Sequence, residues 1–348
     1  MRHQFHYPIT ETEAGMTVEE LLLARGYSRR LIIDLKKSPD YLTIGGVHTY
    51  VTRRLQLGDV LQVLLPEVLP SPGIVPTPME LDILYEDEDL IVLNKAANLP
   101  IHPSQGNYSN TLANGMAWYF AEKGEPFVYR VINRLDRDTT GLLILAKHAL
   151  SACILSDMVQ KRQIHRTYLA AVSGDVRELA QNSRLPGIFL DNAAAAGGFS
   201  DGFSGNVSSS SSGFSGDVGS CGSSSGNFSG SIDAPIARVD GSTIERQVDF
   251  VRGEPARTHF QLLSCNRELD ASILMLKLET GRTHQIRVHC KYMGHPLLGD
   301  FLYNPDYRYI HRQSLHSWKL EFCHPISGRK LNFVAEVPED MQVFVGTP

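Results

Sequence analysis

Short amphipathic patterns bounded by helix-capping residues occupy the first part of the chain. In TVEELLLARG, Thr17 is a candidate N-cap, Glu20 completes a capping box, and Gly26 marks the end of the helix. The next segment, SRRLIIDLKKSPD, has Ser28 as a candidate cap and places three apolar side chains on one face, Leu31, Ile32 and Leu35. The pattern therefore predicts two short helices.

Alternating and proline-rich segments mark where this first region ends. YLTIGGVHTY, with a turn at Gly45–Gly46, and DVLQVLLPE favour short strands. The segment LPSPGIVPTP holds four prolines, which is typical of a linker. We therefore expect a small N-terminal α/β domain over residues 1–70, a linker over 71–82, and a larger domain over 83–348.

The larger region mixes strand and helix patterns. DLIVLNK and GLLILAK are apolar runs typical of buried strands, whereas NTLANGMAWYF, with Asn110 as a candidate cap, and ALSACILSDMVQ have helical spacing. Later candidate strands are RTYLAAVSG, THFQLLSC, SILMLKLET and LNFVAEV. Many strands with few helices between them predict an α+β domain built on a mixed, mainly antiparallel sheet.

A Gly- and Ser-rich segment over about residues 187–232 departs from these patterns. It contains no periodic apolar face, so burial of apolar surface cannot offset the entropy cost of ordering it. We interpret it as a flexible insertion between two core strands. An alternative is that its Gly-Phe-Ser units, at Phe199, Phe203 and Phe214, stack on RNA or bind a partner.

Charge is unevenly distributed along a chain whose net charge is −5. This acidic balance argues against a protein that coats nucleic acid without specificity. Residues 129–168, however, hold seven Lys or Arg and three acids. Such segregation permits one basic surface, although solvated helix faces explain the charges equally well.

Cysteine usage and hydropathy bear on the cellular compartment. The five cysteines are scattered and odd in number, which fits a reducing cytosol better than a closed disulfide framework. The first residues lack the basic and apolar regions of a signal peptide, and no stretch approaches the roughly 20 apolar residues of a membrane helix. A cytoplasmic protein without a membrane partner is expected.

The segment NRLDRDTTGLLILAK places a charged cluster directly before an apolar strand. Asp136 lies between Arg134 and Arg137, and neighbouring cations favour a charged carboxylate. At the end of a strand at Val131–Ile132, Asp136 would project from a rigid scaffold as a nucleophile or general base. A salt-bridged turn is the alternative. A carboxylate pair with Asp138, as in glycosidases, has no geometric support from the spacing.

A second dense segment, residues 278–300, reads LETGRTHQIRVHCKYMGHPLLGD. Thr283 is a candidate cap for a helix that Gly294 closes. His284 and His289 are five residues apart, which is not the i,i+4 spacing of two metal ligands on one helix face, so no metal is expected. A phosphate-binding helix start supported by Arg282 and Thr283 fits the pattern better.

These segments resemble, in order, the motifs of the RluA-type RNA pseudouridine synthases. RLDRDTTGLLILAK is similar to their R-L-D-x-x-T-S-G-L-L motif, and VLNKAANLPIHP and RQIHRTYLAAVSG are similar to two further motifs. ETGRTHQIRVHCKYMGHPLLGD resembles their G-R-T-H-Q-I-R-V-H motif, and RQSLHSWKLEFCHPISG resembles the closing segment. The resemblance covers nearly all of residues 83–340. The N-terminal region is similar to the RNA-binding domain named after small-subunit ribosomal protein four.

The resemblance implies an isomerase that detaches the uracil of a uridine, rotates it and rejoins it through its carbon five. By this similarity Asp136 is the nucleophile, Tyr168 the aromatic residue that holds the base, and Arg287 the cationic partner of the carboxylate. Arg134 matches the arginine that fills the space of a flipped nucleotide. The other expected RNA contacts are Lys95, Arg282 and His284 and, in the N-terminal domain, Arg29, Arg30 and Lys36.

The same resemblance implies an RNA partner and no cofactor or metal, because the reaction involves neither redox chemistry nor hydrolysis. Ribosomal RNA of the large subunit is the expected substrate, transfer RNA is the alternative, and a monomer is expected. A catalytically weak RNA-binding or chaperone protein is the alternative from another class. The chain departs from the family's usual residues at some motif positions, including Asn133 for His, Asn98 for Gly and Arg166 for Lys.

Overall fold

The computed structural model describes residues 3–66, 71, 73–182, 185–191 and 228–345. These residues divide into two compact units, each with segments that are distant in sequence. The first unit comprises Met1–Arg137, Leu142–Ile164 and Glu321–Leu331, and the second comprises Asp138–Gly141, His165–Leu320 and Asn332–Pro348. Among the described residues, no helix is long and apolar enough to cross a bilayer.

The N-terminal part of the first unit is a four-stranded sheet with two helices packed on it. Its strands follow the order β1-β4-β2-β3. The elements are β1 (Gln4–Pro8), α1 (Val18–Ala24), α2 (Arg29–Leu35), a 3₁₀ turn (Pro39–Tyr41), β2 (Leu42–Ile44), β3 (Val47–His48) and β4 (Val60–Leu64). We call residues 3–65 the N-terminal module. The boundary predicted near residue 70 stays a prediction.

The predicted helix caps of this module are confirmed. The backbone N–H of Thr17 donates to Glu20 Oε2 at 2.7 Å, and Thr17 Oγ1 accepts from the N–H of Glu20 at 3.2 Å. Ser28 Oγ accepts from the N–H of Leu31 at 3.2 Å. Strand β1 was not predicted, because QFHYP is too short and too polar to signal a strand before its pairing with β4 is known.

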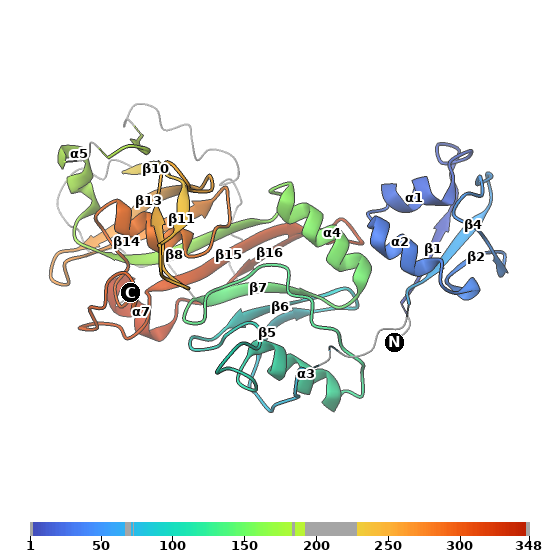
Figure 1. The fold of residues 1–348 in the computed structure, drawn as a ribbon, viewed down its shortest axis with the longest axis horizontal. Helices are drawn as coiled ribbons and strands as arrows, with labels where there is room; N and C mark the ends of the chain where they lie inside the picture. Colours follow the sequence, from blue (N-terminus) through green and yellow to red (C-terminus); the bar gives the residue numbers. More distant parts are fainter. Residues whose placement is uncertain (1–2, 67–70, 72, 183–184, 192–227, 346–348) are drawn as a thin grey trace, which may run out of the picture. The chain divides into compact units, whose positions relative to one another are not determined.

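Besides the residues Glu321–Leu331 near the end of the chain, the remainder of the first unit contains two strands, most of a third, and two longer helices (Figure 1). They are β5 (Asp82–Glu86), β6 (Leu90–Lys95), α3 (Leu112–Glu122), β7 (Thr140–Ala146) and α4 (Ala149–Gln160). Strand β5 pairs antiparallel with β6, and every residue of β7 is buried, as its apolar sequence predicts. The N-cap of α3 is Thr111, whose N–H donates to Asn114 Oδ1, so the predicted cap Asn110 is wrong by one residue.

The second unit is dominated by long antiparallel strands. In order across the sheet, β8 (His165–Ser173) pairs with β14 (Ala271–Leu278), then β13 (Arg257–Asn266), β10 (Ser229–Asp233) and β9 (Ile188–Leu190). The start of β15 (Leu315–Cys323) pairs in parallel with Thr140 and Gly141 of β7. The other elements are β11 (Ile236–Arg238), β12 (Arg246–Val248), β16 (Lys330–Val334), another 3₁₀ turn (Val176–Glu178), α5 (Leu179–Asn182), α6 (Gln285–Tyr292) and α7 (Glu339–Val345). The predicted α+β class with a mainly antiparallel sheet is confirmed.

The predicted insertion begins and ends in paired strands. β9 lies at its start and β10 at its end, and the two strands pair antiparallel through Gly230 and Leu190. Residues 192–227, where most of the Gly/Ser-rich sequence falls, lie outside the described residues. The strands show that the ends of the predicted segment belong to the sheet.

A glycine is required where β7 meets β15. Gly141 has φ +107°, and a Cβ built on it would lie 2.3 Å from the carbonyl oxygen and 2.7 Å from the amide nitrogen of Ser317. Both of these atoms belong to the backbone of a buried strand, so they cannot move aside as a flexible side chain could.

We expect Gly141→Ala to destabilise the protein by about 1–3 kcal/mol, because the left-handed backbone is strained by a side chain and the strand pair must separate. The matched control is Gly294→Ala, which has φ +89° but open space around the added carbon. Urea unfolding of both variants measures the difference. Equal losses of stability would show that close approach to Ser317 contributes nothing.

Candidate active site

In the first unit, the loop that carries Asp136 is fixed before and after this residue. Asn133 is buried, donates to the carbonyl of Leu142 at 3.3 Å, and accepts from the N–H of Ile144 at 2.8 Å. After Asp136, the carbonyl of Arg137 accepts from Lys95 Nζ at 2.8 Å and from the N–H of Leu99 at 3.1 Å. The carboxylate of Asp136 is therefore presented by a loop with little freedom to move.

Lys95 holds this loop from inside the protein. It is 2% exposed, and besides Arg137 its ammonium donates to the carbonyls of Ala96 at 2.7 Å and Leu99 at 3.1 Å. A buried ammonium is tolerated when its donors are satisfied, and backbone carbonyls serve that purpose here. The geometry favours an internal role for Lys95, and its predicted contact with RNA stays a prediction.

Exposure differs sharply among the four charged residues of the cluster. Arg134 and Arg137 are exposed, Asp136 is half-buried, and Asp138 is buried at 8% exposure. Burial lowers the pKa of His102, from the LPIHP segment, and the nearby charge of Arg134 lowers it further. The guanidinium of Arg134 therefore lies near the neutral ring of His102, at the surface of the loop that carries Asp136.

In the second unit, the turn that follows Asp136 is held by the RQSLHS segment. Arg312 donates to the carbonyl of Asp138 at 3.2 Å while a bidentate pair with Asp340, at 2.6 and 2.7 Å, orients its guanidinium. Thr140 Oγ1 lies 2.8 Å from Nδ1 of His316. Arg312 was not singled out in the sequence, although it begins one of the motifs.

Arg287 is fixed by a buried ion pair that the sequence interpretation missed. It lies on α6 and is 2% exposed, and Asp300 is fully buried. Nε and Nη2 of Arg287 each donate to one carboxylate oxygen of Asp300 at 2.7 Å. Tyr303 adds a cation–π contact, with its ring centroid 5.0 Å from the guanidinium carbon. Such bidentate geometry orients the plane of the guanidinium, and the carboxylate also balances its positive charge.

The start of α6 differs from the prediction. His284, in a left-handed conformation with φ +57°, is the N-cap, and Thr283 precedes it. The Gln285 side chain accepts from the N–H of Arg282 at 2.9 Å. The exposed guanidinium of Arg282 pairs with Glu254 at 2.5 Å, which weakens the case for a phosphate site there. His284 Nδ1 lies 3.0 Å from the hydroxyl of Tyr303.

Tyr168 lies on β8, opposite Leu276 of β14, and is 4% exposed. The structure therefore assigns the predicted residues to two sets. Lys95, Arg134, Asp136, Arg29, Arg30 and Lys36 belong to the first unit, and Tyr168, Arg282, His284 and Arg287 belong to the second. The catalytic roles of Asp136, Tyr168 and Arg287 stay predictions.

The His and Cys residues of α6 serve the fold. Burial lowers the pKa of His289 to about 4, and its ring nitrogens lie 2.8 Å from Thr258 Oγ1 and 2.9 Å from the carbonyl of Ala234. Burial raises the pKa of the Cys290 thiol to about 12. An imidazole whose two ring nitrogens are both engaged in hydrogen bonds, and a thiol that stays protonated, are poor metal ligands.

Among the described residues, Asp87, Asp89 and His324 bring donor atoms within 4.8 Å of one another. His324 Nδ1 accepts from the N–H groups of Ile326 and Ser327, so its Nε2 carries the proton and donates to Asp87 at 2.8 Å. A ring nitrogen that carries a proton cannot bind a metal. This cluster is therefore a hydrogen-bonded support between the β5–β6 turn and the chain after β15.

Comparison with known proteins relates the chain to RNA pseudouridine synthases. A family model described as RNA pseudouridylate synthase matches residues 89–292. An uncharacterized RNA pseudouridine synthase of Bacillus subtilis, YjbO, is 34% identical and aligns over 95% of this chain and 98% of its own length. Ribosomal large subunit pseudouridine synthase D of Escherichia coli is 29% identical and aligns over 98% of this chain and 93% of its own length. The solved structure of human RNA pseudouridylate synthase domain-containing protein 1 has the same fold, with a TM-score of 0.52 at 20% identity. The match covers 79% of this chain and 90% of the human chain.

Removing Asp300 takes away the carboxylate to which two nitrogens of the buried Arg287 donate. We expect Asp300→Ala to cost about 3–5 kcal/mol of stability, measured by urea unfolding. Asp306→Ala is the control, because Asp306 forms a similar forked pair with Arg308 at the surface. The control should lose far less, and losses of similar size would contradict the importance of burial.

Proposed function

The chain belongs to the RluA-type RNA pseudouridine synthase family, and on this premise we propose that it isomerises uridines in large-subunit ribosomal RNA. The support for this substrate is that relatives named ribosomal large subunit pseudouridine synthase D align over nearly the whole chain, N-terminal module included. Action on ribosomal RNA would place the protein in the cytoplasm, in agreement with its scattered cysteines.

We propose Asp136 as the nucleophile. The observation that carries this assignment is the loop fixed by Asn133 on one side and by Lys95 on the other, which limits the motion of a half-buried carboxylate. Restricted motion lowers the entropy cost of reaching the reacting atom. The carboxylate would add to the ribose anomeric carbon or promote glycal formation, in either case breaking the bond from that carbon to uracil N1.

The remaining steps conserve all atoms. The detached uracil turns and forms a bond from its C5 to the anomeric carbon. On the covalent route the carboxylate leaves that carbon as the new bond forms, and on the glycal route C2′ regains the proton that it gave up. C5 then loses its proton, and N1 gains one. No electron acceptor and no water molecule is consumed. In this scheme Tyr168 supplies an aromatic face for the base and a group for proton transfer, and Arg287 supplies positive charge for the carboxylate.

Arg134 is the candidate for filling the space that the target nucleotide leaves. A uridine inside a helix or stacked loop hides its glycosidic bond, so it must be flipped out before chemistry. The support for Arg134 is that its side chain is exposed two residues before Asp136. A long cationic side chain there can interact with both the vacated stack and the neighbouring phosphates.

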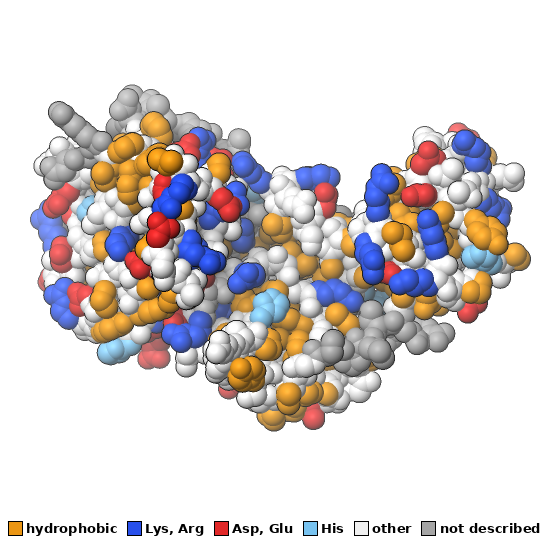
Figure 2. Space-filling model, viewed as in Figure 1, with side chains coloured by type: hydrophobic (Ala, Val, Ile, Leu, Met, Phe, Trp, Pro, Cys, Tyr) orange, Lys and Arg blue, Asp and Glu red, His pale blue; other side chains and the backbone are white. Residues whose placement is uncertain are grey.

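Further RNA contacts would come from the N-terminal module. Arg29, Arg30 and Lys36 are exposed on or next to α2, and Lys and Arg side chains gather over this part of the molecule in Figure 2. Phosphate contacts of this kind strengthen binding without selecting a sequence, and salt weakens them. The module thus contributes affinity, whereas the site around Asp136 contributes the chemistry.

We expect Asp136→Asn to abolish pseudouridine formation, lowering the rate by several orders of magnitude, because a neutral amide is a poor nucleophile. The assay is tritium release from large-subunit ribosomal RNA labelled at uracil C5, with transfer RNA as a second substrate. Asp138→Asn is the matched control, two residues away on the same turn, and its effect should be milder.

RNA binding by Asp136→Asn, measured by filter retention, should stay close to that of the unmodified protein. Equal tritium release by the two proteins would contradict the nucleophile assignment. Release from transfer RNA alone would contradict the ribosomal substrate, and no release by the unmodified protein from either RNA would contradict both.

A further inference from the structure

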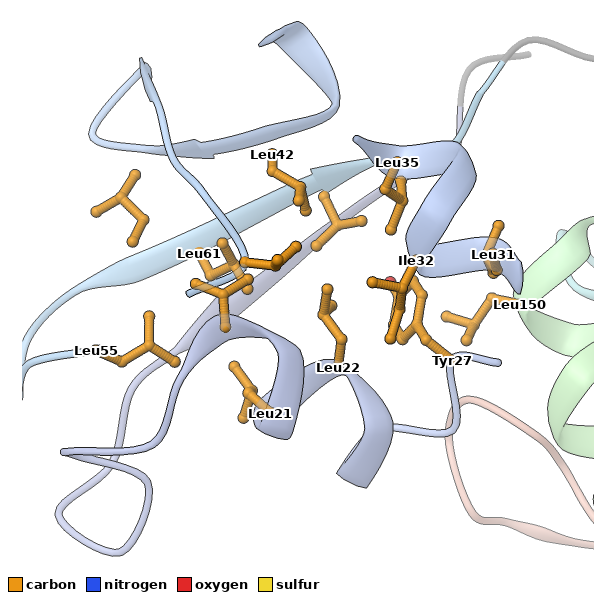
Figure 3. Close-up of a cluster of buried hydrophobic side chains, with 14 of the residues drawn as sticks. Leu21, Leu22, Tyr27, Leu31, Ile32, Leu35, Leu42, Leu55, Leu61 and Leu150 are labelled. Atoms are coloured by element: carbon orange, nitrogen blue, oxygen red, sulfur yellow. The ribbon is translucent and has the colours of Figure 1, made fainter. Parts of the chain in front are cut away.

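Helix α4 presents an apolar face to the N-terminal module. Leu150, from the first turn of α4, is 1% exposed and belongs to the same buried cluster as Tyr27, Leu31 and Ile32 of the module (Figure 3). Three further residues of α4 pack against this cluster, Ala149, Cys153 and Ile154. The core of the module is therefore completed by a side chain from outside it.

The turn between α1 and α2 lies close against α4. Gly26 has φ +87°, and a Cβ added to it would lie 2.6 Å from Cγ1 of Ile154. Two residues on, Ser28 Oγ and Cys153 Sγ are 3.3 Å apart. Contacts this short leave no room for a larger side chain or for water between the turn and the helix.

A second contact involves the first strand of the module. The rings of His3 and Phe5 have centroids 4.6 and 5.5 Å from that of His148, the N-cap of α4. His148 is 3% exposed, and its Nε2 lies 2.7 Å from Asp89 Oδ1. Since β1 and the α1–α2 turn are separate parts of the module, contact at both resists rotation of the module on α4.

The chain that leaves the module is also attached. Asn114 of α3 donates its side-chain amide to the carbonyl of Val75 at 2.8 Å, and its own carbonyl accepts from the N–H of Thr77 at 3.2 Å. A Cβ on Gly115 would lie 2.8 Å from Sδ of Met79. Although the sequence predicts a linker here, Val75, Thr77 and Met79 all lie against α3.

We infer that the N-terminal module stays docked on α4 while the enzyme works. The exposed basic side chains on and next to α2 (Arg29, Arg30 and Lys36) and the Asp136 loop then form one rigid RNA-binding surface. This inference rests on the proposed function. When two binding sites are held at a fixed separation, binding at one raises the effective concentration of the ligand at the other, but only if the ligand is long enough to reach both. The substrate is therefore a folded RNA large enough to reach from α2 to the loop, whereas a short hairpin gains nothing from the module.

The first experiment locks the docked state. Ser28→Cys places a second thiol beside Cys153, and mild oxidation with diamide should join the two, because the observed spacing needs only a small adjustment. Mass spectrometry identifies the disulfide, and Ser28→Cys with Cys153→Ser is the control that cannot form it. We expect the oxidised protein to release tritium from ribosomal RNA within about twofold of its reduced form.

Failure of the disulfide to form would overturn docking itself, whatever the activity of the protein. Formation of the disulfide with a large, thiol-reversible loss of activity would show that the module must leave α4 for catalysis. Both readouts differ from failure of the proposed function, in which the unmodified protein releases no tritium and the disulfide still forms.

The second experiment disturbs the contact without touching a basic residue. Gly26→Ala drives a methyl group into Ile154, whereas the control Gly58→Ala, at φ +88° in the same module, meets no atom within 4 Å. We expect Gly26→Ala to lower kcat/KM on large-subunit RNA by about tenfold. On a short hairpin that carries the target uridine, kcat/KM should stay unchanged. Gly58→Ala should behave as the unmodified protein.

Adding Ile154→Ala to Gly26→Ala removes the clashing atoms, so the double variant should recover most of its activity on the large RNA. An equal loss on both RNAs, or a loss that Ile154→Ala does not relieve, would mean that Gly26 acts within the module alone. Either result would overturn the inference that docking couples the module to the substrate.

Discussion

The buried ammonium of Lys95 is the interaction on which the candidate site in the first unit depends. It lies at the end of β6 and donates to carbonyls of the chain that follows this strand and of Arg137, directly after Asp136. Three carbonyls that converge away from water, without a cation between them, would repel one another. The cation turns this arrangement into a stable one. It also explains how a loop without regular secondary structure can hold a carboxylate in place.

The second unit uses the same principle with a different cation. Arg287 is buried, and its bidentate pair with Asp300 sets the orientation of its guanidinium. Buried ion pairs contribute little net stability, since the desolvation of both partners offsets their attraction. A chain that keeps such a pair gains orientation from it instead. Arg312 is also buried; it forms a bidentate pair with the exposed carboxylate of Asp340 and donates to the carbonyl of Asp138. In both units, buried cations fix the backbone and side chains of the sequence motifs.

Features that depend on neighbouring residues could be predicted from the sequence, whereas features that depend on distant residues could not. The caps at Thr17 and Ser28 depend on atoms three residues away, and the apolar run of β7 depends only on burial, so these predictions are confirmed. The caps of α3 and α6 were each misplaced by one residue, because Asn114 and Gln285 accept hydrogen bonds that the spacing of capping residues does not reveal. Asp300 and Arg312 are ordinary charged residues in sequence. Their importance comes from partners 13 and 28 residues away.

The N-terminal module also shows where local reasoning ends. Its helices, strands and caps follow from the sequence of the module, but Leu150, which completes its core, comes from a helix well outside it. A module with its own complete core would be stable apart from the rest of the chain, and a flexible linker would then allow it many positions. A module that buries Leu150 loses apolar contact when it separates, so the docked position is favoured by the same burial that stabilises its fold. On this inference, burial against α4 rather than the predicted linker holds the module in place.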